Sequence, residues 1–412
     1  MMKSFKRSLL CGALALPLFS QRPAFDPRSM IVVGDGIAAG MNDFALRETY
    51  QKLAFPALVA AQLNTAMELP LIEAPGLGSV PGFPVLPVRV PGPGQTTVRT
   101  QFPPPLFVQN LSVPGAKLTD VLTRKPGWPL VQPNDPQQTL TNMILGYPAL
   151  ILGNDKPLWT AADYAEQMAP TFVVVSLGYS EFLDAAATGD IRLLPDLAAA
   201  KTNMTLILKR MKDTQAKVIV LNAPDPLDTA FFTTLSGATN IVGATAAQLQ
   251  RVFGLKSDDV LTVQGVTSAA RMLRQGAITT LPAGSVISGS AAAAISASVK
   301  AYNAMIATAV QDQNLKSYDL NALLRGLRVN GLTIGNNVYT ADYLGGLYTL
   351  SGFYPGNTVH ALIANGIIST LNSTYGTSYL TVNVTTAAGN DPATRFISPQ
   401  SRRPVGPIEV SR

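Results

Sequence analysis

The chain has 412 residues, of which 47% are hydrophobic and 14% charged. This balance excludes a largely disordered chain and provides enough apolar side chains for a large core. The formal net charge is +6, but three basic residues lie in the first seven positions, and setting them aside leaves 28 basic and 25 acidic residues. So small an excess does not indicate a nucleic-acid-binding surface, and we expect no nucleic-acid partner.

The first twenty residues have the order of segments found in a secretory signal peptide. Basic residues up to Arg7 precede an apolar run from Ser8 to Phe19, which is too short to span a bilayer. We therefore expect residues 1–20 to be a signal peptide with a poorly marked cleavage site, and the mature protein to be secreted or periplasmic. No later apolar run reaches membrane-spanning length without charged, proline or glycine residues, so no transmembrane segment is expected.

A strand followed by a tight turn is predicted near the start of the mature chain. Residues 31–33 are three apolar β-formers that run into Gly34-Asp35-Gly36, and small residues continue to Gly40. Glycines at this spacing indicate a turn whose backbone comes close to another group. In an α/β protein, sites are commonly built at the carboxyl end of such a strand. Asp35 fits either a carboxylate of a site or an acceptor for the amides of the turn.

Strand-like apolar runs then alternate with helix-like segments. The run at 171–177 is almost continuously β-branched or apolar, which is typical of a strand buried on both faces of a sheet. Alternation of this kind predicts an α/β protein with a mainly parallel sheet between helices. The predicted strands are 30–34, 107–110, 171–177, 217–222 and 316–320, and the main predicted helices are 55–63, 195–215 and 291–313.

Three segments interrupt or follow this alternation. Residues 66–105 are dense in proline and glycine and are interpreted as a long ordered loop. Residues 227–290 contain irregular amphipathic pieces and are interpreted as an insertion beside the active-site edge of the sheet. Residues 387–412 are polar, with several arginines, and are predicted to be a mobile basic tail.

Four stretches of the chain resemble sequence blocks of the SGNH (GDSL-type) hydrolases, in the right order. The turn at 34–36 resembles block I (Gly-Asp-Ser), the segment ending at Pro114-Gly115 resembles block II, and residues 178–181 (GYSE) lie where block III has Gly-x-Asn-Asp. The resemblance spans about residues 30–377. It implies an SGNH-hydrolase-like domain over 28–380, a three-layer α/β/α sandwich with a mainly parallel, flavodoxin-like sheet and long loop insertions.

The same resemblance implies that the family's catalytic serine corresponds to Gly36, which has no side chain. Gly115 corresponds to the glycine whose backbone N–H contributes to the oxyanion hole. The asparagine that completes the oxyanion hole corresponds to Ser180. Only the glycine donor is therefore retained among these three roles.

Block V of the family, Asp-x-x-His-Pro followed by a helix, fits the segment 345–365 in two registers. One takes the only histidine, His360, as the base and Asn357 as the acid. The other places the acid on Ser351 and the histidine on Tyr354. The second register is favoured because it needs no gap and keeps both Pro355 and the following helix in place. His360 would then be a half-buried or surface residue of that helix.

The favoured register predicts a pseudoenzyme, because a tyrosine is a poor base at neutral pH and a serine cannot replace an acid. We expect a secreted protein that binds an acyl, glycan or other small-molecule ligand, or acts at a surface, without cofactor or metal. The catalytic positions Gly36, Gly115, Ser180, Ser351 and Tyr354 should converge at one edge of the sheet. The loops 66–105 and 227–290 should lie on that side. The predicted binding residues are Asp35, Gly36, Gly115, Ser180, Glu181 and Tyr354.

Two other hypotheses stay open from the sequence. The first is an ester hydrolase or acyltransferase with a non-standard catalytic set. Such an enzyme would use His360 in a relocated triad, or a pair of acids among Asp35, Glu181 and Asp184. The second is a purely structural envelope protein, which would have no cleft. The sequence indicates neither a particular ligand nor an oligomeric state.

Overall fold

The computed structural model describes residues 25–83, 99–100, 107–147, 149–152, 158–276 and 278–396. Its centre is a four-stranded sheet in the order β1-β4-β5-β9, with every neighbouring pair parallel. The predicted α/β class with a parallel sheet is confirmed. The strands are β1 (Met30–Gly34), β4 (Phe172–Ser176), β5 (Lys217–Leu221) and β9 (Lys316–Tyr318).

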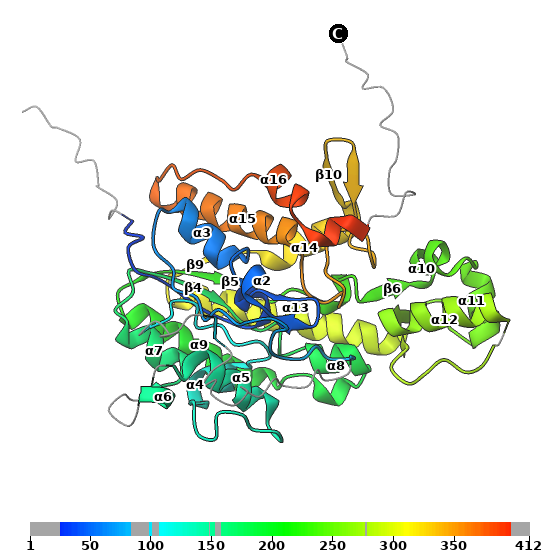
Figure 1. Cartoon of the computed structure of the whole chain (residues 1–412), viewed down its shortest axis with the longest axis horizontal. Coiled ribbons are helices and arrows are strands. Elements are labelled where there is room, and N and C mark those ends of the chain that lie inside the picture. Colours follow the sequence, from blue (N-terminus) through cyan, green and yellow to red (C-terminus); the bar gives the residue numbers. More distant parts are fainter. Residues whose placement is uncertain are drawn as a thin grey trace, which may run out of the picture.

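The central strands form where the sequence is continuously apolar. β1 and β4 are buried at every position, and β5 is buried at all but its first residue. A strand with both faces covered has no reason to alternate polar and apolar side chains. Figure 1 shows the cause, because helices lie above and below the sheet.

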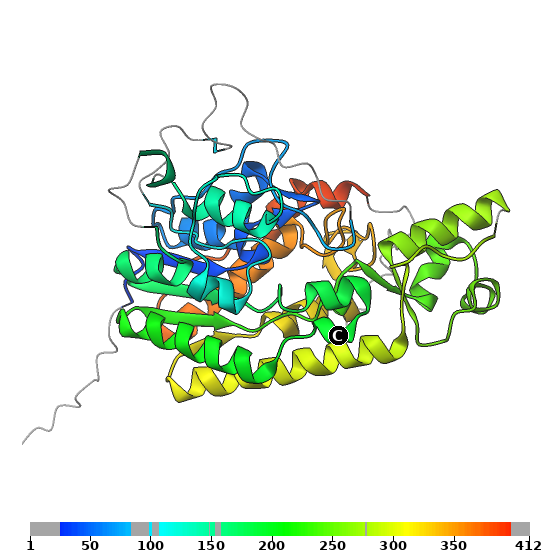
Figure 2. The ribbon, with the colours of Figure 1, turned by 90° about the horizontal axis from the view of Figure 1, so that it is seen from below.

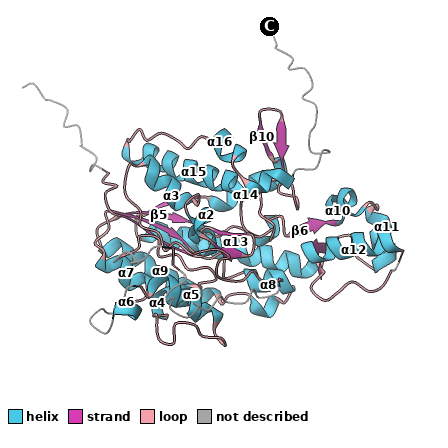
Figure 3. Cartoon of the chain, viewed as in Figure 1, coloured by secondary structure: helices cyan, strands magenta, loops and turns pink. Residues whose placement is uncertain are grey.

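Helices pack in one layer on each face of the sheet (Figures 1 and 3). On one face α3 (Phe55–Gln62) packs against α15 (Asn357–Tyr375). On the other, α9 (Leu197–Asp213) packs against α13 (Gly289–Asp312). The remaining helices of the body are α1 (Gly36–Ala39), α2 (Glu48–Gln51), α4 (Leu118–Thr123), α5 (Pro136–Leu145), α6 (Ala149–Leu152), α7 (Ala161–Gln167), α8 (Leu183–Thr188), α14 (Leu320–Asn330) and α16 (Val384–Gly389). Short pairs β2–β3 (Met41–Asn42, Ala45–Leu46) and β10–β11 (Leu332–Ile334, Asn337–Tyr339) complete it.

The strand predicted at 107–110 is reduced to a single bridge between Val32 and Asn110 at the edge of β1. The backbone still follows β1, because Val32 N donates to Gln109 O at 2.9 Å and Leu111 N donates to Val32 O at 2.8 Å. The pairing continues beyond that point, since Val113 N donates to Gly34 O at 3.2 Å. The Asn110 side chain makes two further hydrogen bonds outside this ladder. Its Oδ1 accepts from Ser112 N at 3.2 Å, and its Nδ2 donates to Ala38 O at 2.8 Å.

Residues 227–290 form a small lobe with its own core, which we call the insertion lobe. An antiparallel sheet of β6 (Phe232–Thr234), β7 (Val260–Thr262) and β8 (Val286–Ile287) packs on three helices. A separate hydrophobic cluster that includes Leu249 and Val266 holds it together. Figure 2 shows the lobe projecting from one end of the body. Its helices are α10 (Leu235–Val242), α11 (Ala246–Phe253) and α12 (Val263–Gln275).

The start of the predicted mobile tail is ordered, which corrects that part of the prediction. Residues 387–389 end α16, Asp391 is buried, and a 3₁₀ helix spans Pro392–Phe396. Residues 397–412 lie outside the described part of the chain, as does the predicted signal peptide. Within the described residues, no helix combines the length and apolar character needed to cross a membrane.

Asp391 explains this order because it caps α15 from 33 residues away. The residue before α15 is Gly356, which has no side chain to cap the helix. Asp391 Oδ2 instead accepts from Thr358 N at 2.7 Å and Thr358 Oγ1 at 2.8 Å, and its Oδ1 accepts from Ala393 N at 3.0 Å. The sequence did not reveal this role. The segment around Asp391 is polar, and its partner Thr358 lies 33 residues earlier.

Replacing Asp391 with alanine should lower the free energy of unfolding by about 2–3 kcal/mol. The substitution removes a helix cap and leaves the buried amide and hydroxyl of Thr358 without an acceptor. Urea denaturation of the purified protein measures the loss. Asp391→Asn keeps one acceptor oxygen and should lose less. Equal stability of Asp391→Ala and the wild type would show that α15 needs no cap from the C-terminal segment.

Candidate functional site

Two turns meet at the carboxyl edge of the sheet, one after β1 and one after β4. Asp35 N donates to Ser176 O at 3.1 Å, and Ser180 N donates to Asp35 Oδ2 at 3.0 Å. Parallel pairing of β1 and β4 brings both strands to the same edge, so these contacts follow from the register. Asp35 therefore joins the turns that resemble blocks I and III.

The side chain of Tyr354 fills the space next to Gly36. A Cβ atom built on Gly36 would lie 2.6 Å from both Cε1 and Oη of Tyr354 and 2.9 Å from Cζ. Tyr354 is fully buried, with 1% of its surface exposed. The position that resembles the nucleophile's is thus occupied by an aromatic ring, and Gly36 is the residue that leaves room for it. This placement favours the register with Tyr354 in the histidine position.

Aromatic packing fixes the loop that carries Tyr354. The hydroxyl of Tyr179 donates to Phe353 O at 2.7 Å, and the rings of Tyr179 and Tyr354 lie 6.1 Å apart, edge to face. Phe353 stacks on Phe231 of the insertion lobe with ring centroids 4.0 Å apart. Phe231 N also donates to Gly352 O at 3.0 Å, at a residue whose φ of +76° favours glycine. Loop 351–354 is therefore held from two sides.

His360 is a core residue, which corrects the expectation of a half-buried or surface histidine. It is 2% exposed, and its Nδ1 accepts from Phe55 N at 3.2 Å at the start of α3. Burial lowers its pKa to about 4, so the ring is neutral at physiological pH. None of the hydrogen bonds in the described residues joins His360 to a serine or a carboxylate, and a relocated triad has no support there.

A cleft of about 480 Å³ opens at the same edge of the sheet. Gly115, Ser180, Glu181 and Tyr354 line it together, although they come from three separate segments. Four of the six predicted binding residues are therefore at the cleft. Asp35 and Gly36 do not line it, and the ring of Tyr354 lies against Gly36.

The other elements contribute unequally to the cleft. Ser351 is buried with its Oγ 3.4 Å from Thr349 Oγ1, and it does not line the cleft, so the expected five positions do not all converge. Ser79 and Pro81, from the 66–105 loop, do line it. The insertion lobe supplies none of the lining residues among those described, and its base packs behind Phe353 instead. The expectation that both insertions shape the pocket thus holds for the first alone.

No protein-family model matches this chain, and no curated protein does. Solved structures resemble it weakly. An acetyl xylan esterase, AlAXEase, gives a TM-score of 0.36 at 10% identity over 83% of this chain and 99% of its own. Phospholipase A1 from Streptomyces albidoflavus NA297 gives 0.36 at 12% identity over 84% and 99%. LAE5, an α/β hydrolase from the metagenome of Lake Arreo, gives 0.37 at 10% identity over 87% and 100%. Similarity at this level carries no inference about activity, so function is argued from the site.

The carboxylates near the cleft are each engaged by backbone amides or by a lysine. Burial raises the pKa of Asp35 to about 7, partly offset by the N–H groups of Ser180 and Ile37. Burial also raises the pKa of Glu181, whose Oε1 accepts from Leu118 N at 2.7 Å. Asp184 lies 3.4 Å from Lys117 Nζ. The nearby charge of Glu181 adds to the rise in the pKa of Asp35.

Gln137 is the cleft residue that sequence reasoning missed. It lies in the first turn of α5, and its Oε1 would be 2.5 Å from a Cβ atom on Gly115, whose φ is +79°. The Nε2 of Gln137 and the Oγ of Ser180 are buried and have no hydrogen-bond partner within the described residues. The Asp135-Pro136 pair, typical of a helix start, was the available signal that this side chain begins a helix beside the cleft.

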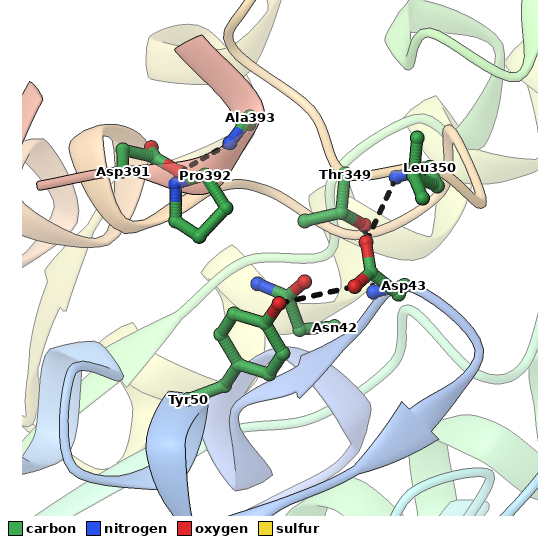
Figure 4. Close-up of a pocket in the computed structure, with 8 residues that line it drawn as sticks. All are labelled: Asn42, Asp43, Tyr50, Thr349, Leu350, Asp391, Pro392 and Ala393. Carbon is green, nitrogen blue, oxygen red and sulfur yellow. Dashed lines mark hydrogen bonds between the residues drawn. The ribbon is translucent and has the colours of Figure 1, made fainter. Parts of the chain in front are cut away.

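A second, smaller cavity of about 110 Å³ lies between the β2–β3 turn, loop 349–350 and the 3₁₀ helix after Asp391 (Figure 4). Its carboxylates are already used: Asp43 Oδ1 accepts from Leu350 N at 3.1 Å, and Tyr50 donates to Asp43 Oδ2 at 3.0 Å. Within the described residues, no three side chains of the His, Cys, Asp or Glu type are grouped to hold a metal ion. The hydrogen bonds around this cavity therefore hold neighbouring segments of the fold together.

Proposed function

We propose that this protein is a secreted pseudoenzyme of the SGNH (GDSL-type) fold that binds a small-molecule ligand in the cleft beside Tyr354. The observation that carries the proposal is the ring of Tyr354 lying against Gly36, in the space a nucleophilic side chain would need. A substitution that only removed a hydroxyl would leave that space open. Here the space is filled and buried, as expected for a site that no longer carries out acyl transfer.

The positions that correspond to the base and the acid of a triad support the same proposal, and so does the histidine. Burial, with the nearby charge of Asp35 as a smaller cause, raises the pKa of Tyr354 well above its usual value, so the phenol stays protonated and cannot act as a base. Ser351 is buried against Thr349. His360 accepts a backbone hydrogen bond in the core. Among the described residues, none of the positions that correspond to the family's nucleophile, acid and base therefore carries its usual group.

The cleft itself argues for binding rather than for a purely structural role. Its volume of about 480 Å³ lies in the range of small-molecule sites. Buried polar atoms normally find a partner, and leaving them unpaired costs about 1–3 kcal/mol each. Gln137 and Ser180, which line the cleft, each carry such an atom, enclosed within the protein. The volume of the cleft is therefore the observation that supports binding.

The purified mature protein should neither be labelled by a fluorophosphonate nor hydrolyse p-nitrophenyl acetate or butyrate above background. Residual assistance from the Gly115 amide is a small part of a triad enzyme's rate. In-gel fluorescence and an absorbance assay make the two measurements, with an active serine esterase as the positive control. Stoichiometric labelling that is abolished by replacing one serine and by His360→Ala would refute the pseudoenzyme proposal.

A further inference from the structure

We infer that the smaller cavity, of about 110 Å³, binds a small primary amine in its protonated form through the amide of Asn42 and the unbalanced charge of Asp391. None of the residues that line this cavity lines the cleft beside Tyr354. The inference therefore goes beyond the proposed function and does not depend on it. It rests on an amide without a partner, a buried charge without a counter-charge, and the size of the space.

The amide of Asn42 is the unsatisfied polar group of this cavity. The residue is buried, with 3% of its surface exposed, and its side chain makes none of the hydrogen bonds found within the described residues. Unlike the enclosed polar atoms of Gln137 and Ser180, this amide reaches the surface of its cavity. Figure 4 shows the side chain directed into the space that Tyr50 and the other lining residues surround. Because buried amides normally find partners, we expect the partner of Asn42 to lie in the cavity.

The second feature is a buried negative charge that no cation balances. Asp43 and Asp391 line the cavity, and no basic side chain is among its described lining residues. Arg47 pairs with Asp43, with Nη2 2.9 Å from Oδ2. Asp391 is 1% exposed and has no ion-pair partner within the described part of the chain. An unpaired buried charge is costly, and water in the cavity would leave it unpaired, whereas a bound cation would balance it.

The remaining acceptors suit an ammonium group better than a metal ion. All four carboxylate oxygens of Asp43 and Asp391 already accept an N–H or O–H group, and no three metal-binding side chains are grouped within the described residues. A calcium ion takes about six to eight oxygen ligands. An ammonium group needs only three acceptors. Asn42 Oδ1, the oxygen of Tyr50 and the second lone pair of Asp43 Oδ1 are available for it.

The size of the cavity limits the rest of the ligand. Since a water molecule takes up about 30 Å³, a space of about 110 Å³ holds roughly four non-hydrogen atoms. Methylamine and ethanolamine lie within that limit, whereas a sugar ring or an acyl chain does not. Leu350, Pro392 and Ala393 provide apolar surface for the carbon atoms of such an amine.

The test is calorimetric titration of the purified full-length protein with methylamine and ethanolamine at neutral pH and constant ionic strength. At least one of these protonated amines should bind saturably. Tetramethylammonium, which has the same charge but no N–H group, should not bind, and neither should acetate or calcium chloride. Binding of tetramethylammonium or calcium in place of the amines would overturn the inference, and so would the absence of binding by both amines.

Asn42→Leu removes the amide and keeps a side chain of similar size. It should weaken the Kd of the bound amine roughly tenfold, as expected for the loss of one hydrogen bond. The thermal midpoint of the free variant should stay within a few degrees of the wild type, because the amide has no partner in the fold. Asp391→Asn, which removes the unbalanced charge, should also weaken binding.

Asn134→Leu is the matched control, because Asn134 is exposed and lines neither the cavity nor the cleft. It should leave the Kd unchanged. Unchanged affinity of Asn42→Leu would overturn the inference. A large loss of stability in Asn42→Leu would overturn it as well, since the fold itself would then need the amide. Ester hydrolysis in the separate assay would instead refute the proposed function alone.

Discussion

Replacing Gly36 with serine should destabilise the protein by about 2–4 kcal/mol and should produce no esterase. The new Cβ would lie 2.6 Å from two atoms of the buried Tyr354 ring, so the ring or the turn must shift. Overpacking of a buried site typically costs about 1–3 kcal/mol, and displacement of a hydrogen-bonded loop adds to it. Denaturant unfolding measures the loss, and a p-nitrophenyl acetate assay tests for activity.

A double-mutant cycle with Tyr354→Ala separates this collision from a general intolerance of the turn. Tyr354→Ala alone leaves a cavity and should cost about 3–5 kcal/mol. In the double variant the serine no longer meets the ring, so the combined loss should be smaller than the sum by more than about 1 kcal/mol. Additive losses, or a stable Gly36→Ser variant, would show that the ring does not depend on the glycine.

Asp35→Asn should remove a pH dependence of stability between about pH 4 and pH 7. Burial raises the folded-state pKa of Asp35 from 3.8 to about 7. Within this window the folded protein holds a proton that the unfolded chain has released, so the free energy of unfolding falls as pH rises. A shift of this size corresponds to at most about 4 kcal/mol, all of it lost above pH 7. Asparagine cannot ionise, so the Asp35→Asn variant loses no stability from this cause as pH rises.

Urea titrations of the wild type and of Asp35→Asn at half-unit steps from pH 4 to pH 8 measure this difference. The wild type should lose stability relative to the variant as pH rises, and the two curves should run parallel above pH 7. Asp312→Asn, at the exposed end of α13, is the surface control. Parallel curves across the whole range would mean that Asp35 ionises in the folded state as readily as in the unfolded chain.

The central fold could be predicted from the sequence because its signal is local. The runs that became β1, β4 and β5 are continuously apolar, and nothing else in an α/β protein requires such runs. The segment 107–110 is only half apolar, because Gln109 and Asn110 are polar, and it lies at the edge of the sheet. There its backbone follows β1 through hydrogen bonds but forms only one bridge, at Asn110.

From the sequence, only those site residues that lie near the ends of parallel strands could be predicted. Gly115, Ser180 and Tyr354 lie at the cleft because turns after parallel strands meet at one edge. Gln137 could not be found in this way, because it reaches the cleft from the first turn of α5 and not from a strand end. The Asp135-Pro136 pair marks the start of that helix but not its place beside the cleft. Ser351 was misplaced, because it is buried in the core with its Oγ 3.4 Å from Thr349 Oγ1 and does not reach the cleft.

The cap that Asp391 provides also sets an order of events during synthesis. Its partner Thr358 is made 33 residues earlier, so the first turn of α15 has no cap until those residues have followed. The segment just before α15 carries Tyr354, which lies against the turn at Gly36. The two ends of the body are therefore joined late, after every strand of the central sheet has already been synthesised. A chain interrupted before residue 391 would contain every strand of the central sheet and Tyr354, but the first turn of α15 would lack its cap.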